Sequence, residues 1–106
     1  MFKLCFFVPE SHLESVKEAI FNAGAGRMGD YEHCCWQVLG VGQFRPLAGS
    51  QPFIGEQEQI TKVAEWKVET VMADDRVQAV LAALRQAHPY EEPAFDIWPL
   101  WDVPKS

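Results

Sequence analysis

One segment, His88-Pro89-Tyr90-Glu91-Glu92-Pro93, constrains the fold of this chain more than any other. Pro89 moves the residue before it out of helical geometry, so the helical pattern that precedes the segment must end there. Pro93 has no backbone N–H, which suits the first or an edge position of a strand. The segment therefore predicts a short, stiff connector between a helix and a final strand. It also gathers an imidazole, a phenol and two carboxylates, more polar chemistry than a plain junction needs.

Apolar residues at helical spacing predict two helices. These helices are expected over residues 11–23 and 75–87. Ser11 and Glu14 have the spacing of a capping box at the start of the first helix, and Gly24 lies where a left-handed C-cap would end it. Asp74 or Asp75 is expected to cap the second helix through its side chain.

Four further segments have the patterns of strands. They are expected near residues 2–8, 33–44, 62–73 and 94–100. The first is a nearly continuous apolar run, as in a strand buried on both faces, and the third alternates cleanly around Trp66. Gly40 and Gly42 predict a bulge or the close approach of another backbone. The order βαββαβ predicts an α+β, ferredoxin-like fold over a single domain of residues 1–106, with a four-stranded antiparallel sheet and two helices on one face.

Two connections stand out by composition. Residues 24–30 contain three glycines but match neither the dinucleotide-binding nor the P-loop spacing, so they are expected to reverse the chain with positive φ angles. Residues 44–56 form the one long connection, and they are too rich in Phe, Leu and Ile for a floppy linker. Long ordered loops are usually functional, so we expect this one to pack on the domain and to bind something.

Charge and cysteine usage exclude several classes of function. The formal net charge is −6, the isoelectric point is near 4.9, and no cluster of Lys and Arg exists. The chain is therefore not expected to bind nucleic acid or an anionic membrane surface. No apolar run approaches the roughly 20 residues that span a bilayer, and the apolar start lacks a signal-peptide cleavage site. Three cysteines, two of them adjacent, predict a reduced, cytoplasmic setting.

Candidate chemistry concentrates around two histidines. His33, His88 and Glu92 are ligand types for Zn²⁺ or Cu²⁺, with Glu91 and Cys34 as further donors, but no tight pair of ligands is evident in the spacing. The alternative is that His88 and Tyr90 anchor the junction through hydrogen bonds. Cys34 and Cys35 lie in a strand, where cysteine is usually a small core residue and not a nucleophile. Acidic pairs such as Glu65 with Glu69 are expected to be solvated charge or interface contacts.

Several segments in this order resemble a known family. They are Phe7-Val8-Pro9, Gly24-Ala25-Gly26, Gly29-Asp30-Tyr31-Glu32-His33-Cys34, Gly40-Val41-Gly42-Gln43-Phe44-Arg45-Pro46, Gln51-Pro52-Phe53-Ile54-Gly55-Glu56, Val63-Ala64-Glu65, Val68-Glu69-Thr70 and His88–Pro93. The chain resembles the domain inserted in the dinuclear-metal proteins of the Ngg-interacting-factor-three family, the YqfO-like, type 2 homologues of GTP cyclohydrolase I. The His-Pro-Tyr-Glu run also resembles that of CutA divalent-cation-tolerance proteins, and both groups are similar in fold to PII signalling proteins.

The resemblance implies a binding or regulatory role rather than an enzyme. In the full-length relatives, the two-metal site belongs to flanking domains that this chain lacks, so no catalytic residue is carried over. The long connection corresponds to the regulatory loop of PII proteins, which contacts a partner or a small ligand. The candidate ligand-binding residues are accordingly His33, Phe44, Pro46, Gly49, Pro52, Gly55, His88, Tyr90 and Glu91. We expect His33, His88, Tyr90 and Glu91 to lie close together, within one chain or across an interface. The alternative function is that of a small divalent-metal-binding protein.

The distribution of faces predicts a homo-oligomer. Two helices on one face of the sheet leave Trp98 and Lys67 on the open face, where a second copy of the chain would cover them. PII and CutA proteins are trimers, so the resemblance implies a homotrimer. Glu65 and Glu69 are then expected either near the rim of the interface or paired with Arg45 or Arg27 from the long loops of a neighbouring copy.

Overall fold

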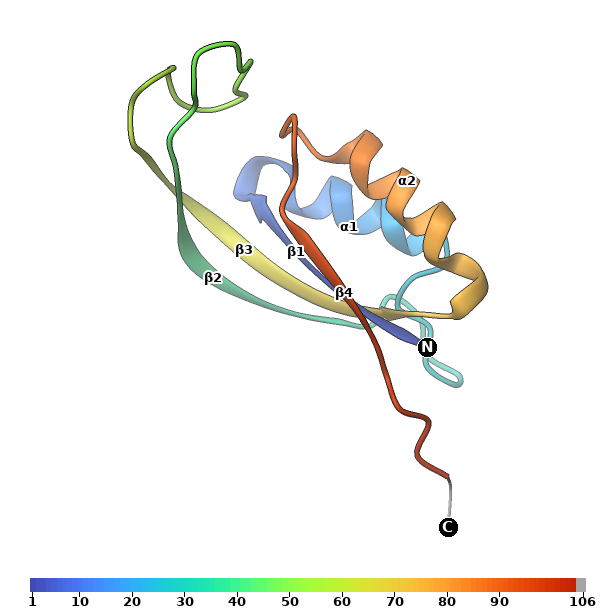
Figure 1. Cartoon of the computed structure of the whole chain (residues 1–106). Coiled ribbons are helices and arrows are strands. Elements are labelled where there is room, and N and C mark those ends of the chain that lie inside the picture. The colour runs from blue at the N-terminus through green and yellow to red at the C-terminus, as the bar shows by residue number, and fades with distance from the viewer. Residues whose placement is uncertain (105–106) are drawn as a thin grey trace.

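The computed structural model describes residues 1–104 and contains a four-stranded sheet with two helices on one face (Figure 1). Its strands and helices are β1 (Phe2–Pro9), α1 (Leu13–Asn22), β2 (Cys35–Phe44), β3 (Thr61–Met72), α2 (Val77–Ala87) and β4 (Phe95–Pro99). The strand order is β2-β3-β1-β4, and every neighbouring pair is antiparallel. The predicted α+β, ferredoxin-like arrangement is confirmed.

The core lies between the helices and the sheet. Alternate residues of the two central strands point into it, because successive side chains of a strand face opposite sides. The residues with no exposed surface are Leu4, Phe6, Val8, Val16, Ile20, Val68, Val80 and Leu84. Phe95 and Ile97 of β4, the edge strand beside β1, pack against this cluster. The helical stripes and the strand alternation thus meet in one apolar layer.

The helix starts differ from the prediction. A 3₁₀ turn precedes each helix, Glu10–His12 before α1 and Asp74–Arg76 before α2, and no side chain caps either helix start. Backbone hydrogen bonds hold these turns instead; for example, Arg76 N–H donates to the Ala73 carbonyl at 3.0 Å. Ser11 lies inside its turn, and its hydroxyl contacts His12 Nδ1 at 2.8 Å. The predicted capping box and the predicted aspartate cap were therefore wrong.

The end of α1 follows the prediction. Gly24 has a φ of +114°, and its N–H donates to the Phe21 carbonyl at 3.0 Å, while Ala25 N–H reaches the Ile20 carbonyl at 3.0 Å. These two bonds define a Schellman motif. Gly26, with a φ of +79°, lies so close to Cys34 that a Cβ atom there would be 2.9 Å from the Cys34 backbone nitrogen. The glycines of this loop therefore reverse the chain, as expected, and Gly26 also allows close packing against Cys34.

The open face of the sheet carries exposed aromatic and aliphatic side chains. The strand register places Trp36 beside Glu69 and Val38 beside Lys67, and it places Trp98 beside Lys3. Trp36 is 59% exposed and Trp98 is 40% exposed. The expected position of Trp98 and Lys67 on this face is thus confirmed by the register, with Trp36 and Val38 alongside them.

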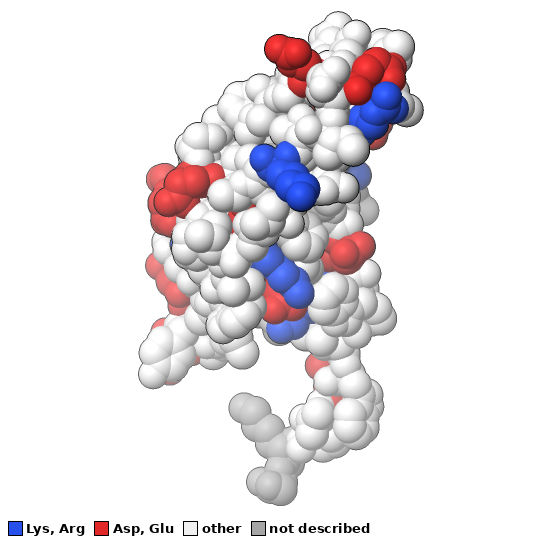
Figure 2. Space-filling view, turned by 90° about the vertical axis from the view of Figure 1, so that its left-hand side faces the viewer, with Lys and Arg blue, Asp and Glu red and all other residues white. Residues whose placement is uncertain are grey.

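Acidic and basic side chains are interspersed on the side of the molecule drawn in Figure 2, where they form no continuous basic patch. Within residues 1–104, no helix has both the length and the apolar character needed to cross a membrane.

Candidate functional site

Two segments far apart in the sequence meet at one end of the sheet. The long loop, residues 45–60, joins β2 to β3, and the connector, residues 88–93, joins α2 to β4 (Figure 1). A hydrogen bond of 3.3 Å from Gln51 N–H to Glu91 Oε1 links them directly. The loop also reaches the start of α1, because the ring of Phe53 packs edge-on against His12 with centroids 5.2 Å apart.

His88 anchors the connector. It ends α2 in an extended conformation, with φ −72° and ψ 136°, as the following proline predicted. Its side chain is 5% exposed, and its Nε2–H donates to the Phe7 carbonyl at 2.6 Å while Nδ1 accepts from Tyr90 N–H at 3.1 Å. Burial lowers the pKa of His88 below its ordinary value. Both ring nitrogens of a neutral imidazole are thus used, which favours the anchoring interpretation over metal binding.

Tyr90 links the connector to strand β3 of the sheet. Its hydroxyl donates to Glu65 Oε2 at 2.8 Å, and its ring packs on His88 with centroids 4.8 Å apart. Burial, the hydrogen bond with Glu65 and the negative charge of Glu65 all raise the pKa of Tyr90, so the phenol stays protonated. The rings of Phe44 and Phe53 lie 6.1 and 6.4 Å from the Tyr90 ring, both tilted against it.

Gly42 makes room for the Glu65 carboxylate. A Cβ atom at Gly42 would lie 1.7 Å from Glu65 Oε1. The register of β2 with β3 is regular from Cys35 to Phe44, so the expected bulge is absent in this pair, and the close approach comes from a side chain instead of a backbone. Within the chain, Glu65 binds Tyr90 and Arg45 pairs with Glu58 at 3.0 Å. Glu65 is therefore not merely solvated charge, and its pairing with Arg45 or Arg27 of a neighbouring copy stays a prediction.

The long loop is held mainly by its own hydrogen bonds. Glu58 Oε1 accepts from Ala48 N–H at 3.0 Å, and Glu58 N–H donates to the Pro46 carbonyl at 2.6 Å. Gln57 Nε2 donates to the Ser50 carbonyl at 2.7 Å. Gly49 and Gly55 turn the chain with φ angles of +95° and +91°. These contacts make the loop an ordered element, in agreement with its apolar composition.

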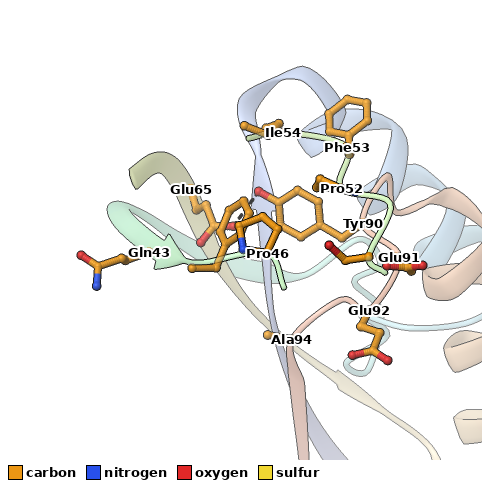
Figure 3. A pocket seen from close by; sticks show the side chains of 12 residues that line it. Gln43, Pro46, Pro52, Phe53, Ile54, Glu65, Tyr90, Glu91, Glu92 and Ala94 are labelled. Carbon is orange, nitrogen blue, oxygen red and sulfur yellow. Dashed lines mark hydrogen bonds between the residues drawn. The ribbon is translucent and has the colours of Figure 1, made fainter. Parts of the chain in front are cut away.

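Between the long loop and the connector lies a pocket of about 280 Å³ (Figure 3). Its lining residues are Gln43, Phe44, Pro46, Ser50, Pro52, Phe53, Ile54, Glu65, Tyr90, Glu91, Glu92 and Ala94. Five of the candidate ligand-binding residues are therefore present: Phe44, Pro46, Pro52, Tyr90 and Glu91. Gly49 and Gly55 belong to the same loop without lining the pocket, and His88 supports Tyr90 from the side of the core.

Glu65 and Phe53 are two of the pocket residues that the candidate list lacked, together with Gln43, Ser50, Ile54 and Ala94. The aromatic character of the long loop was a usable signal for Phe53. No local pattern pointed to Glu65, which lies 25 residues from Tyr90 in the chain.

His33 lies elsewhere. It has a φ of +60°, which delays the start of β2 from the expected residue 33 to Cys35, and its ring stacks on Phe21 with centroids 5.0 Å apart. Phe21 is at the end of the helical layer where α1 stops and α2 begins, since Gly24 lies against Arg76. His88 is at the other end of α2, an 11-residue helix about 16 Å long.

Within one chain, His33 therefore does not join His88, Tyr90 and Glu91, and its approach across an interface stays a prediction. Among residues 1–104, no three His, Cys, Asp or Glu side chains are grouped to hold a metal ion. The expected metal set of His33, His88 and Glu92 is thus not assembled within a single chain.

Comparison with known proteins agrees with this architecture. No family model matches the chain. Over 103 residues it is 52% identical to a GTP cyclohydrolase 1 type 2 homolog of Mycobacterium tuberculosis, covering 96% of this chain and 27% of the relative. A protein of the same name from Bacillus subtilis is 44% identical over 102 residues, again 96% of this chain and 27% of the relative. The chain thus spans about a quarter of the length of the curated relatives it matches.

Solved structures give the same result. A Bacillus cereus protein related to NIF3 is 38% identical with a TM-score of 0.81, covering 95% of this chain and 26% of the other. CutA1 from Pyrococcus horikoshii has a TM-score of 0.70 at 14% identity, covering 99% of this chain and 88% of the other, which is a likeness of fold alone. The chain is therefore a homologue of one segment of the GTP cyclohydrolase 1 type 2 homologs, the NIF3- and YqfO-like proteins, and it has the CutA- and PII-like fold.

Proposed function

We propose that residues 1–106 act as one binding module without catalytic activity, which takes a small ligand in the pocket between the long loop and the connector and regulates a partner. The observation that carries this proposal is the pocket itself, walled by two ordered segments that meet through the Gln51–Glu91 hydrogen bond. Ligand sites are typically such largely preformed, mostly apolar clefts with a few placed polar groups.

The polar groups around the pocket support binding in preference to catalysis. His88 is neutral and uses both ring nitrogens for backbone contacts, so it has no free nitrogen with which to move a proton. The raised pKa of Tyr90 and its bond to Glu65 make the phenol a poor acid near neutral pH. Cys5, Cys34 and Cys35 do not line the pocket. The odd number of cysteines, two of them adjacent, supports the proposed cytoplasmic setting.

We also propose a homotrimer in which the open sheet faces turn toward one another. Trp36, Val38 and Trp98 are exposed apolar residues on this face, and large exposed apolar patches usually mark an interface. A neighbouring copy can cover all three residues at once, and each buried aromatic ring stabilises assembly by roughly 1.5–3 kcal/mol. The CutA-like fold agrees with assembly of this kind.

A titration followed by nuclear magnetic resonance tests the binding role. Fragments in three matched sets, cationic, neutral and anionic, are added to the ¹⁵N-labelled protein. We expect at least one set to move the amide signals of Gln51, Tyr90 and Glu91 in a saturable way. Glu18→Gln is a suitable control variant, because Glu18 is exposed on α1 and does not line the pocket. If no set moves the pocket signals, the proposed binding role is wrong.

The metal-binding alternative has a separate test. A metal ion would have to displace the hydrogen bonds of His88 to Phe7 and Tyr90, which costs stability. We therefore expect calorimetric titration with Zn²⁺ or Cu²⁺ at neutral pH to give no saturable heat. Saturable binding that disappears in both His33→Ala and His88→Gln would instead favour a site shared between chains.

A further inference from the structure

The pocket between the long loop and the connector combines three aromatic rings with three carboxylates. Phe44, Phe53 and Tyr90 supply the rings, and Glu65, Glu91 and Glu92 supply the acids. No Lys or Arg is found among the described residues that line it, and Arg45, the nearest basic residue in sequence to the pocket wall, pairs with Glu58. The charge of the lining is therefore negative without compensation inside the pocket.

The three carboxylates differ in exposure and in their hydrogen bonds. Glu65 is half-buried beside Tyr90, and it is bonded through Oε2 to the Tyr90 hydroxyl, which leaves Oε1 toward Gly42. Glu91 and Glu92 are exposed residues of the lining (Figure 3). Glu91 also accepts a hydrogen bond from Gln51 N–H through Oε1. A positive ligand group would meet exposed acids first and a partly desolvated one behind them, where attraction is stronger than at the surface.

The rings point to the same class of ligand. Their centroid separations of 6.1 and 6.4 Å lie near the upper end of the range for aromatic pairs, and their planes are tilted by 55° and 49°. The rings are thus not tightly stacked, and all three line the pocket. An alkylated ammonium group is attracted to such ring faces by cation–π interactions. A bare metal ion instead needs several converging ligand atoms, which the described residues do not assemble.

We infer that the pocket binds a compact organic cation, an alkylated ammonium group carried on a short apolar skeleton. The volume of about 280 Å³ is at the lower limit of ligand pockets, which excludes a dinucleotide or another large cofactor. A phosphate or carboxylate ligand would be repelled by the three glutamates. This inference rests on the proposed binding role and adds to it the charge and size of the ligand.

Choline and its uncharged isostere 3,3-dimethylbutanol test the inference, because the two differ in charge while they share shape and hydroxyl group. Titrations of the whole chain are followed through the amide signals of Gln51, Tyr90 and Glu91. We expect choline to bind about tenfold or more tightly than the isostere, the usual range for a cation beside ring faces and a carboxylate. Betaine, which adds a carboxylate to the same quaternary ammonium group, should bind more weakly than choline.

Variants locate the effect. Glu91→Gln keeps the oxygen that accepts from Gln51 N–H and removes one negative charge, so choline should bind about threefold or more weakly. Phe44→Leu should weaken it as well. Glu18→Gln is the matched control, because it removes the same charge from an exposed position on α1, and it should change the affinity little.

Two results would overturn the inference. One is an isostere that binds as tightly as choline. The other is choline that leaves the pocket signals unmoved up to about 20 mM, beyond the millimolar affinity expected of so small a ligand. If neutral or anionic fragments still move these signals, only the ligand class is wrong. If no fragment of any charge moves them, the binding role itself fails.

Discussion

The contact between Gly42, Glu65 and Tyr90 gives a sharp test of how the pocket wall is built. In Gly42→Ala, the added Cβ would occupy the place of the Glu65 carboxylate, 1.7 Å from Oε1. The carboxylate is the far end of a flexible side chain, so it can swing away and the strand need not move. The cost of the substitution is therefore the lost hydrogen bond to Tyr90, not a steric clash.

The magnitude follows from two opposing effects. A hydrogen bond to a charged group contributes about 1.5–3 kcal/mol, and we take the lower value because Glu65 regains water when it swings out. Replacing glycine by alanine inside a strand gains about 0.5–1 kcal/mol, and Gly42 does not have the positive φ that would oppose this gain. We therefore expect Gly42→Ala to lower the free energy of unfolding by about 0.5–1 kcal/mol.

Gly40→Ala is the matched control in the same strand. Its Cβ would lie 4.0 Å from the Glu65 carbonyl oxygen, which is ordinary contact, so this variant should be more stable than the native protein by the same gain of about 0.5–1 kcal/mol. The difference between the two alanine variants, about 1.5 kcal/mol, then measures the Tyr90–Glu65 bond. Urea unfolding followed by tryptophan fluorescence, at one fixed protein concentration, gives each value.

Repeating both substitutions in a Tyr90→Phe background completes the test. The bond is already absent there, so the difference between Gly42→Ala and Gly40→Ala should shrink to nearly zero. A difference that persists at full size in this background would refute the reasoning, since the cost would then come from somewhere other than Tyr90. Equal stabilities of Gly42→Ala and Gly40→Ala in the native background would refute it as well.

Three further predictions concern other parts of the chain. Burial lowers the pKa of His88 below the 6.5 of an unfolded imidazole. The free energy of unfolding should therefore fall as the pH drops below about 6.5, by up to 1.4 kcal/mol per pH unit. In His88→Gln, the free energy of unfolding should depend less on pH in this range. Trp98→Glu should convert the proposed trimer to a 12.0 kDa species in sedimentation, and native protein that already sediments at this mass would contradict the trimer. Gly26→Ala should lower the free energy of unfolding in urea by about 1–3 kcal/mol more than Gly29→Ala. Both glycines have positive φ, but only Gly26 lies against Cys34. Equal losses of stability in the two variants would show that this contact is unimportant.

The fold was predictable from the sequence because its signals are local and repeated. The apolar stripes of both helices and the alternation around Trp66 need only the periods 3.6 and 2, and Pro89 sets the end of α2 by its own geometry. The helix starts were not predictable in the same way. Ser11 and Glu14 have the spacing of a capping box, but the chain leaves β1 through a 3₁₀ turn, which puts Ser11 inside the turn. Propensity alone does not choose between these two starts.

The candidate site was predictable only in part. The long loop and the connector were both identified by composition, since ordered apolar residues and fixed prolines are visible in the sequence itself. The role of Glu65 depended on the register between β2 and β3, and a 16-residue connection between those strands leaves the register open. His33 was grouped with the connector by residue type, whereas its place was decided by stacking on Phe21. Long-range contacts of this kind leave no local pattern.

The internal hydrogen bonds of the long loop have a consequence for the kinetics of binding. A loop that folds only around its ligand must lose chain entropy at that moment, which weakens and slows association. Here the side chains of Glu58 and Gln57 already hold the backbone of the loop through hydrogen bonds. The loop also contacts the rest of the molecule through Gln51 and the ring of Phe53. A ligand would therefore meet a loop whose backbone is already folded. Association should accordingly be fast, and differences in affinity between ligands should arise mainly from how quickly each one leaves.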